Sequence, residues 1–375
     1  DSANNKFRAE VNSCNVADPS ASMMIIQRSR LLWFFSALSQ VDQYHNFKSY
    51  ADLQFQELVE YFYDSRDGGF YWEIDADGEV VNTRKQTYAQ AFCIYALSEY
   101  HLLTRSAEAK ELALSTFTYL ESHAWDAIND GYIEALDRTW SPMADMRLSP
   151  KDKNEPKTMN THLHVLEAYS NLAKIASNDT VHSSLVRVTK LYYNKFYHQD
   201  KGQFQLFFSN EWELRSDIVS YGHDIESVWL MLEAALQSGD NSLRNMTEQL
   251  VIEVADTIIE NGVSKDGGIK NEVHKDVADK TYDWWPQAEA VVGFLDAYQL
   301  STDTKYLSVA NNCLRFIKDH FEDKKYGEWH WNIDEDLQAN RSISKSSAWK
   351  APYHNGRMYL EVLKRLAHLS NGSHE

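Results

Sequence analysis

The sequence predicts an all-α protein of the (α/α)6-barrel class, in which six helical hairpins close into a ring and short β-hairpins lie in the loops between them. Three observations predict it: Gly and Pro are scarce, a glycine turn motif repeats, and two amphipathic segments separate successive turns. The 375 residues are 43% hydrophobic, which supplies a sizeable core and excludes a disordered chain. We expect a single domain over residues 1–375.

The turn motif combines polar residues and a glycine with a following alternation of aromatic and polar residues. It occurs five times at similar intervals, as expected of a repeat architecture, and each copy should open a short strand or hairpin. The five glycines are Gly68, Gly131, Gly202, Gly267 and Gly327.

Between the turns, apolar residues recur at helical spacing, as in Leu31, Phe34, Phe35 and Leu38. The expected helix pairs are 24–41 with 48–64, 85–103 with 107–123, 158–177 with 182–197, 223–238 with 242–260, and 284–300 with 304–320, and a last helix covers about 353–369. Residues 4–14 could supply a twelfth helix that closes the ring beside the last one. An open solenoid of the same hairpins is the alternative.

In a closed ring the first helix of each pair lines the inside, and these first helices carry the unusual polar residues. Unpaired polar groups on a buried inner wall cost free energy, so their concentration there indicates a pocket. The chain also contains 11 Trp, 21 Tyr and 16 Phe, which suit a core or platforms for a ligand with flat apolar faces, such as a sugar.

The formal net charge is −18 at pH 7. Because that field repels polyanions, nucleic acid is not an expected partner. No basic amphipathic stretch and no run of 18 apolar residues occurs, so we expect no membrane contact. Residues 1–22 are polar and lack the apolar segment of a secretory signal, and we expect a cytoplasmic protein.

No sequence motif indicates a metal or cofactor. Cys14, Cys93 and Cys313 lie far apart without CxxC spacing. Metalloprotease, P-loop, dinucleotide-binding and nucleophile-elbow motifs are absent from the sequence. We therefore expect no metal and no cofactor, and the histidines described below are expected to carry protons.

The segment beginning Ser220-Tyr221-Gly222 has the residues of a helix start, and His223 and Glu226 follow it at i,i+3 spacing. A carboxylate beside an imidazole raises its pKa and fixes its orientation, which makes a general acid/base unit. A purely structural pair at a helix start is the alternative.

Lys157, Asn160 and His164 form one polar stripe on a helix, at i, i+3 and i+7. His162 lies about 200° away around the helix axis, so both histidines cannot point into one pocket. We expect His164 in the pocket and His162 in the core.

Trp285 and Glu289 lie four residues apart at the start of another inner helix. A tryptophan beside a carboxylate suits a sugar, because the ring stacks on C–H faces while the carboxylate accepts from hydroxyls. A wedge of core tryptophans is the alternative.

His354 follows Pro352, so it should lie in the first turn of the last helix, where the helix dipole disfavours its charged form. Arg30 is a lone cation on an otherwise apolar inner helix and could hold a developing oxyanion.

Taken together, these segments resemble the N-acylglucosamine 2-epimerase superfamily and, within it, the cellobiose 2-epimerases. The matching segments follow in order from about residue 24 to 366, whereas residues 1–22 match poorly. They are the Arg30 helix, 87–92, 159–164, 221–226, 284–290 and 349–355. The family fold is an (α/α)6 barrel, which agrees with the repeat.

The resemblance implies reversible C2 epimerisation of the reducing-end sugar of a β-1,4-linked disaccharide, such as cellobiose to glucosyl-mannose or lactose to epilactose. The ring opens, C2 loses a proton, and a cis-enediol is reprotonated on the other face. Neither metal nor redox cofactor is needed, because the substrate's own aldehyde acidifies C2–H.

The resemblance also implies roles for individual residues. His223 and His354 would be the acid/base pair, with pKa values near the working pH. Which of the two removes the proton is left open. The other expected roles are Arg30 and His164 at the enediolate, Glu226 orienting His223, Trp285 and Trp349 enclosing the reducing sugar, Glu289 on its hydroxyls, and Tyr88, Asn160 and Trp229 in substrate binding.

Several alternatives remain at this stage. A mannobiose 2-epimerase or an aldose–ketose isomerase would use nearly the same residues. A glycoside hydrolase of the same barrel class would need two flanking carboxylates, for which Glu226 and Glu289 are candidates. A non-catalytic sugar-binding protein would not need the two histidines. We expect a monomer, with a dimer as the alternative.

Overall fold

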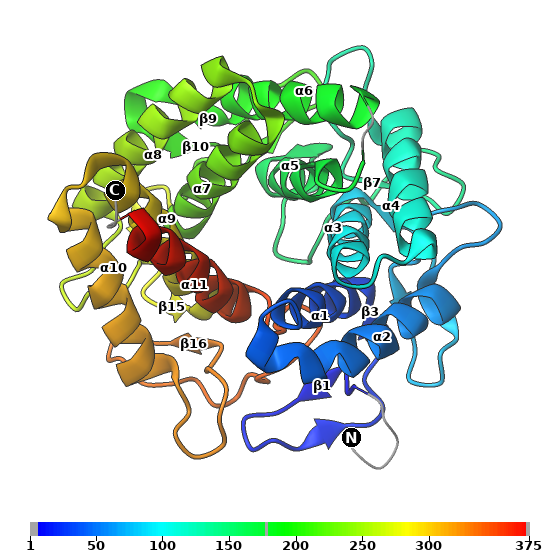
Figure 1. The fold of residues 1–375 in the computed structure, drawn as a ribbon, viewed down its shortest axis with the longest axis horizontal. Helices are drawn as coiled ribbons and strands as arrows, with labels where there is room; N and C mark the ends of the chain where they lie inside the picture. Colours follow the sequence, from blue (N-terminus) through cyan, green and yellow to red (C-terminus); the bar gives the residue numbers. More distant parts are fainter. Residues whose placement is uncertain (1–6, 177–178, 373–375) are drawn as a thin grey trace.

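The computed structural model describes residues 7–176 and 179–372 and confirms the (α/α)6 barrel. Six helices form the inner ring of Figure 1: α1 (Ile25–Leu38), α3 (Thr87–Thr104), α5 (Met159–Ala173), α7 (Tyr221–Ser238), α9 (Trp284–Ser301) and α11 (His354–Gly372). Five helices surround them: α2 (Lys48–Glu57), α4 (Ala107–Tyr119), α6 (Asp179–Phe196), α8 (Asn241–Asn261) and α10 (Thr304–Phe316). The first inner helix contacts the last, so the ring is closed and the open solenoid is excluded.

The outer and inner helices differ in how much of their surface is buried. The outer helix α10 buries Tyr306, Ala310, Cys313 and Phe316, a single stripe at helical spacing. The inner helix α3 is buried around most of its circumference, because it packs on outer helices on one side and on the barrel interior on the other. This is why the polar residues of inner helices are buried and must find partners there.

Three outer helices end in one turn of π-helix, at Leu58–Phe62, Leu120–Ala124 and Ile317–Phe321. Two short 3-10 segments, Asp42–Phe47 and Gln199–Lys201, lie in connections. With the π turns included, the observed helices match the expected ranges to within a few residues.

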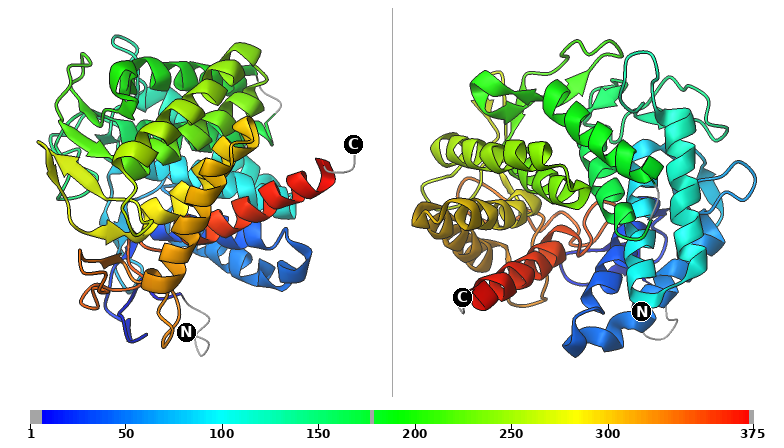
Figure 2. Two further views of the ribbon diagram at one scale, coloured as in Figure 1. Left: turned by 90° about the vertical axis from the view of Figure 1, so that its left-hand side faces the viewer. Right: turned by 45° about the horizontal axis from the view of Figure 1, so that its top comes forward.

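Short strands gather at one end of the barrel (Figure 2). Each of five strands that lead into an inner helix pairs antiparallel with a strand in the turn region that follows the same helix pair. The pairs are β3 (Met23–Met24) with β4 (Glu73–Ile74), β6 (Lys85–Gln86) with β7 (Ala135–Leu136), β8 (Lys157–Thr158) with β11 (Phe207–Phe208), β12 (Ile218–Ser220) with β13 (Glu272–His274), and β15 (Tyr282–Asp283) with β16 (Asn332–Ile333). These ladders fix the N-terminal ends of the inner helices at the same end.

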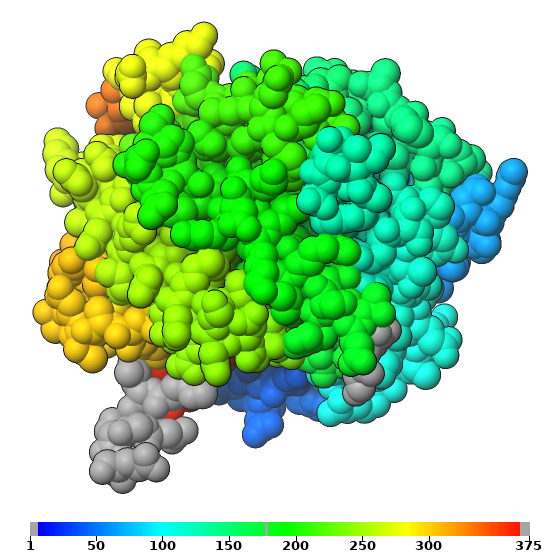
Figure 3. Space-filling model, turned by 90° about the horizontal axis from the view of Figure 1, so that it is seen from above, coloured from blue at the N-terminus to red at the C-terminus, as the bar shows by residue number. Residues whose placement is uncertain are grey.

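The remaining strands extend this end of the barrel. They are β1 (Glu10–Val11), β2 (Ala17–Asp18), β5 (Val80–Asn82), β9 (Tyr197–His198), β10 (Gln203–Phe204) and β14 (Val277–Ala278). In the side view of Figure 3, the hairpin containing β13 and β14 (yellow) stands at one end of the wall of outer helices.

All five motif glycines lie in turns with φ between 61° and 90°, so the predicted repeat is confirmed. In four inner helices the side chain of the fourth residue accepts a hydrogen bond from a backbone amide that follows one of these turns. Gln90 accepts from Phe70, His162 from Tyr132, Asp224 from Phe204, and Gln287 from Ile269. His162 is therefore the core histidine that its helical phase predicted. Its Nδ1 lies 2.7 Å from the Thr158 carbonyl, and its Nε2 accepts from the Tyr132 amide at 2.8 Å.

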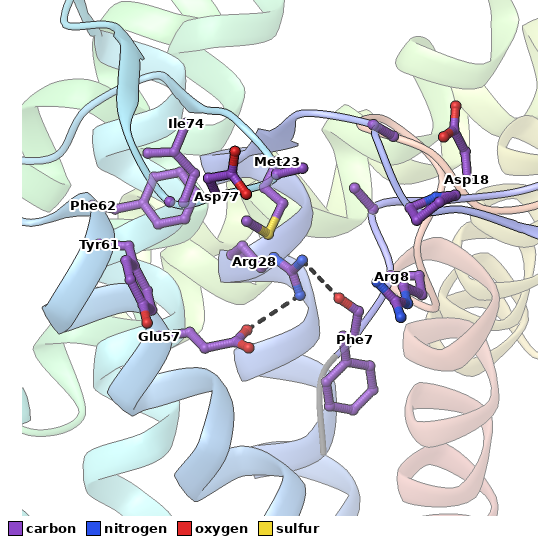
Figure 4. Close-up of a pocket in the computed structure, with 15 residues that line it drawn as sticks. Phe7, Arg8, Asp18, Met23, Arg28, Glu57, Tyr61, Phe62, Ile74 and Asp77 are labelled. Carbon is purple, nitrogen blue, oxygen red and sulfur yellow. Dashed lines mark hydrogen bonds and ion pairs between the residues drawn. The ribbon is translucent and has the colours of Figure 1, made fainter. Parts of the chain in front are cut away.

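The expectation of a helix at residues 4–14 is wrong for the described part of that range; residues 4–6 lie outside the described residues. From residue 7 the chain is extended, and the Val11 amide donates to the Ser346 carbonyl at 3.0 Å. The Phe7 carbonyl accepts from the buried Arg28 guanidinium at 3.0 Å, and Glu57 pairs with the same guanidinium at 3.2 Å (Figure 4). Because buried side chains of α1 bond to carbonyls of this segment, it packs on the barrel in an extended form and does not add a twelfth helix to the ring.

Among the described helices, none combines the length and the apolar character required to cross a membrane.

Candidate active site

A cavity of about 440 Å³ opens at the N-terminal ends of the inner helices. Nine of the eleven expected site residues line it: Arg30, Tyr88, Asn160, His164, His223, Glu226, Trp285, Trp349 and His354. The loop 148–152 and the side chains of Glu272, Asp283, Trp284 and Trp331 complete the lining. The sequence thus predicted the inner-helix residues of this lining apart from Trp284, and of the residues outside the inner helices it predicted only Trp349.

His354 is the first residue of α11, as expected, and its Nδ1 lies 2.6 Å from Glu289 Oε1. Burial lowers the pKa of His354 well below its usual value, and the nearby cations Arg30 and Arg357 lower it further. His354 is therefore neutral at pH 7. With its Nδ1–H donated to the carboxylate, its Nε2 carries the lone pair.

His223 is held differently from the expectation. Its Nδ1 lies 2.8 Å from the Ser220 hydroxyl, and its ring packs on Trp285 with centroids 4.6 Å apart. Glu226 is directed elsewhere and does not orient His223. Burial lowers the pKa of His223 to about 3, so both histidines rest neutral and not, as expected, near half-protonation.

His164 has a carboxylate partner that the sequence analysis missed. Its Nδ1 lies 2.8 Å from Oε2 of Glu167, one helical turn along α5. Both side chains are buried, and the pKa of Glu167 is held down to about 2, chiefly by Arg357 and by the His164 hydrogen bond, which together outweigh desolvation. The i,i+3 spacing used for His223 could have found this pair.

Arg30 is a buried cation that has no carboxylate partner within the described residues. Its Nη1 donates to the Trp349 carbonyl at 2.6 Å and its Nη2 to the Tyr88 hydroxyl at 2.9 Å, while its buried Nε has no partner there. The guanidinium also lies 4.7 Å from the ring centroids of Phe92 and Tyr353. Such a cation can stabilise a negative charge that develops in the cavity.

Glu226, Glu289 and Glu167 converge on one residue, Arg357, which the sequence analysis missed.

Trp229 was expected to bind substrate, but it does not line the cavity and its indole N–H donates to Glu289 at 3.0 Å. Glu289 likewise lies outside the lining and serves His354.

The polar stripe on α5 divides between structure and site. Asn160 and His164 line the cavity, whereas Lys157 is buried, pairs with Asp126 at 2.9 Å and donates to the Asn210 carbonyl at 2.7 Å. Lys157 therefore fixes the rim of the barrel and takes no part in the cavity.

Aromatic rings form much of the cavity wall. Trp285 contacts the rings of both His223 and His354, at 4.6 and 5.7 Å between centroids. Trp284 and Trp331 pack together at 4.5 Å, and Trp349 lies 6.4 Å from Tyr88. Flat faces beside hydrogen-bonding groups suit a pyranose.

One group of described residues could offer metal-ligand atoms close together: Glu226, Glu289 and His354, whose atoms lie within 4.8 Å of one another. Arg357 bonds to both carboxylates, so a cation already occupies that position. The donor set thus fits an arginine better than an added metal ion. All three cysteines are free, with Cys93 and Cys313 buried and Cys14 exposed.

A closed helical ring with histidines, a buried arginine and tryptophans around one cavity is the construction of a carbohydrate-active enzyme of the (α/α)6-barrel class. Residues 11–356 match the family model of N-acylglucosamine 2-epimerase. The chain belongs to the N-acylglucosamine 2-epimerase family. The match begins at residue 11, so it includes part of the N-terminal segment that we expected to match poorly.

The similar proteins include cellobiose 2-epimerases. The chain is 40% identical to that of Bacteroides fragilis over 365 residues, covering 97% of this chain and 93% of the relative. It is 36% identical to that of Dictyoglomus turgidum, covering 93% and 89%. The solved cellobiose 2-epimerase of Bacillus thermoamylovorans superposes with a TM-score of 0.93 at 34% identity, covering 97% and 94%.

Proposed function

We propose that the protein is a cellobiose 2-epimerase, an isomerase that interconverts the C2 epimers of the reducing-end sugar in β-1,4-linked disaccharides. Cellobiose would give glucosyl-mannose, and lactose would give epilactose. One observation carries the proposal: His223 and His354 line the same cavity, both contact the ring of Trp285, and each is anchored through Nδ1. Within the described residues, neither Nε2 has a hydrogen-bond partner, so both are available to substrate.

The reaction needs two proton positions. After the reducing pyranose opens, a neutral imidazole Nε2 takes the C2 proton, and the electron pair moves into the C1–C2 bond while O1 becomes an oxyanion. The other histidine also rests neutral, so it first takes up a proton from water and then delivers it to the opposite face of C2, and the first histidine releases the abstracted proton to water to complete the cycle. Because the aldehyde supplies the electron sink, the protein's own side chains suffice for this step. In the reverse direction the two histidines exchange roles.

Arg30 and His164 support the enediolate in this proposal. Arg30 brings a buried positive charge without a carboxylate to neutralise it, and His164 Nε2 faces the cavity while Glu167 holds Nδ1. In a site shielded from water such a charge contributes several-fold more than it would at the surface.

Two compartments can hold the two sugar rings. The first is the cavity around the histidines, where Trp285 and Trp349 would stack on the reducing sugar and Tyr88 and Asn160 would bind its hydroxyls. A second compartment of about 370 Å³ shares Asn160, His223 and Trp285 with the first. A disaccharide therefore fits the site better than a monosaccharide alone.

The alternatives are separated by chemistry. The candidate carboxylates of a hydrolase, Glu226 and Glu289, are both bound to Arg357 and cannot flank a glycosidic bond. A mannobiose 2-epimerase would differ only in the preferred substrate. An aldose–ketose isomerase would return the proton to C1 in place of C2, and a binding protein would not turn over substrate.

A proton NMR time course of cellobiose with the purified protein in D2O tests the proposal. We expect reducing-end mannose signals to appear with deuterium at C2. Free glucose would indicate hydrolysis, and fructose-type signals would indicate an isomerase. An unchanged spectrum with cellobiose, lactose and mannobiose would overturn the proposal.

Two further expectations accompany this function. A cytoplasmic location is supported by the three free thiols and can be tested by cell fractionation with a thiol-reactive label. Light scattering should give the 43.4 kDa of a monomer, and twice that mass would indicate the dimer.

A further inference from the structure

Arg357 lies at the centre of the carboxylates that surround the site. It is 1% exposed and lies one turn after His354 on α11. Its Nη2 bonds to Glu226 at 2.5 Å and pairs with Glu289 at 2.8 Å, and its Nη1 bonds to Glu167 at 2.5 Å. The three carboxylates come from α5, α7 and α9, so one guanidinium joins four of the six inner helices.

Two of these carboxylates are the partners of site histidines. Glu289 binds Nδ1 of His354, and Glu167 binds Nδ1 of His164. Arg357 thus lies behind both histidines and bonds to the carboxylate that orients each. Its guanidinium is fixed from the sides by the rings of Trp229 and Tyr353, at 4.7 and 4.2 Å.

Glu226 has a different place in the network. Its Oε1 lies 3.9 Å from Nδ1 of His354, beyond hydrogen-bond distance. Burial and the neighbouring Glu289 raise the pKa of Glu226 to about 7. The Arg357 guanidinium opposes this rise, because its bond to Oε1 favours the ionised carboxylate.

From this geometry we infer that Arg357 is a positioning residue, which fixes the Nδ1 hydrogen bonds of His354 and His164 by holding Glu289 and Glu167 in place. It does not touch substrate, because it lies outside the cavity lining. A lysine would keep the charge but lose the planar fork that reaches three carboxylates at once. The inference rests on the proposed epimerase function for its kinetic part only.

The charged and titratable groups that face His354 come from every helix around it. They are Arg30 on α1, Tyr88 on α3, His164 and Glu167 on α5, Glu226 on α7, Glu289 on α9, and Arg357 on α11. Arg357 is the member of this set that contacts all three carboxylates, so its replacement should disturb the carboxylate partners of both His354 and His164, whereas a change of Glu289 or Glu167 removes the direct partner of only one of them.

The test compares Arg357→Lys with Arg365→Lys. Arg365 lies on the same helix, is also buried and pairs with Asp296 at 2.7 and 2.9 Å, and although it lies 5.9 Å from the Trp229 ring, it pairs with none of the three carboxylates that Arg357 holds and does not line the cavity. Both variants should lose thermal stability. We expect Arg357→Lys to lower kcat for cellobiose about 100-fold with KM within about threefold, and Arg365→Lys to keep kcat within about twofold.

A measurement without substrate separates this inference from the proposed function. In protein with ¹⁵N-labelled histidine, the Nδ1–H resonance of His354 should be shifted downfield by its bond to Glu289. It should move in Arg357→Lys and stay in Arg365→Lys. An inactive wild type would overturn the epimerase function, whereas an unmoved resonance together with wild-type kcat would overturn the role of Arg357.

A second variant covers the case in which Arg357→Lys does not fold. Arg357→Met combined with Glu226→Gln removes one positive and one negative charge, so the buried charge balance is kept. A folded double variant whose kcat is well below that of Glu226→Gln alone supports positioning. Full activity per folded molecule would show that Arg357 serves stability alone.

Discussion

Glu289 Oε1 lies 2.6 Å from His354 Nδ1, although 65 residues separate the two in the sequence. A carboxylate at this position favours the imidazolium, yet burial and the cations Arg30 and Arg357 lower the pKa of His354 well below its usual value. The result is a histidine that rests neutral, in one tautomer, with Nε2 presented to the cavity. The carboxylate becomes effective when His354 takes up a proton during the reaction.

Glu289→Gln tests this relationship. The amide oxygen can still accept from Nδ1–H, but the negative charge that stabilises the imidazolium is lost. We expect kcat to fall about 10- to 100-fold with little change in KM, measured by chromatography of cellobiose and its epimer. A raised KM with normal kcat would return Glu289 to the sugar-binding role that its spacing suggested.

His223→Asn and His354→Asn should each lower epimerisation by about 10³-fold or more while the circular dichroism spectrum stays that of the wild type. Each variant keeps one histidine, which can still remove a C2 proton from the epimer that presents it and return it to the same face. We therefore expect deuterium exchange at C2 of one epimer without epimerisation, with the epimer differing between the two variants. Wild-type turnover in either variant would remove that histidine from the reaction.

Arg30→Met removes the buried cation that no described carboxylate neutralises. The enediolate would then lack its positive partner, and we expect kcat to fall about 10²- to 10³-fold with a smaller change in KM. Arg28→Met is the matched control, because Arg28 is also buried on α1 but pairs with Glu57 and the Phe7 carbonyl. A similar loss of kcat in both variants would show that either change disturbs α1 as a whole.

His162→Gln separates the core histidine from His164. Gln90 and Gln287 hold the same turn position in α3 and α9, so glutamine should keep the hydrogen bond to Tyr132 and leave kcat unchanged.

The effect of this substitution should depend on pH. Burial lowers the pKa of His162 from 6.5 to about 3, so below pH 6.5 the unfolded chain binds a proton that the folded chain does not. The contribution of neutral His162 to the free energy of unfolding is fully present above pH 6.5. It is lost as the pH falls, by about 1.4 kcal/mol per pH unit. Between pH 7.5 and pH 5.0, the free energy of unfolding measured with urea should therefore fall less in His162→Gln than in the wild type. Equal losses would contradict a neutral His162.

The fold followed from the sequence because its signals are local. Each glycine turn and each amphipathic segment recurs once per repeat, and the separation of His162 from His164 needs only the helical period. The partners of the buried carboxylates could not be predicted from the sequence in the same way. Glu167 does pair with His164 at i,i+3, but at the same spacing Glu226 turns to Arg357 while Ser220 takes Nδ1 of His223.

The reason is that pairing across the ring depends on how closely the inner helices approach, which no single segment encodes. The N-terminal segment shows the same limit. Its composition allowed a helix, but the buried Gln27 and Arg28 on α1 bond to the carbonyls of Ala9 and Phe7 and hold the chain extended.

Removal of metal ions provides the last prediction. Glu226, Glu289 and His354 offer ligand atoms within 4.8 Å, which is the spacing that a divalent cation could use. Arg357 bonds to both carboxylates, and a metal ion would have to displace its guanidinium from a position where it is buried and held by two aromatic rings. We therefore expect dialysis against a chelator to leave kcat within about twofold of its starting value, with metal content measured before and after by mass spectrometry. A large loss that a stoichiometric divalent ion restores would show that the cluster binds metal and that Arg357 moves aside.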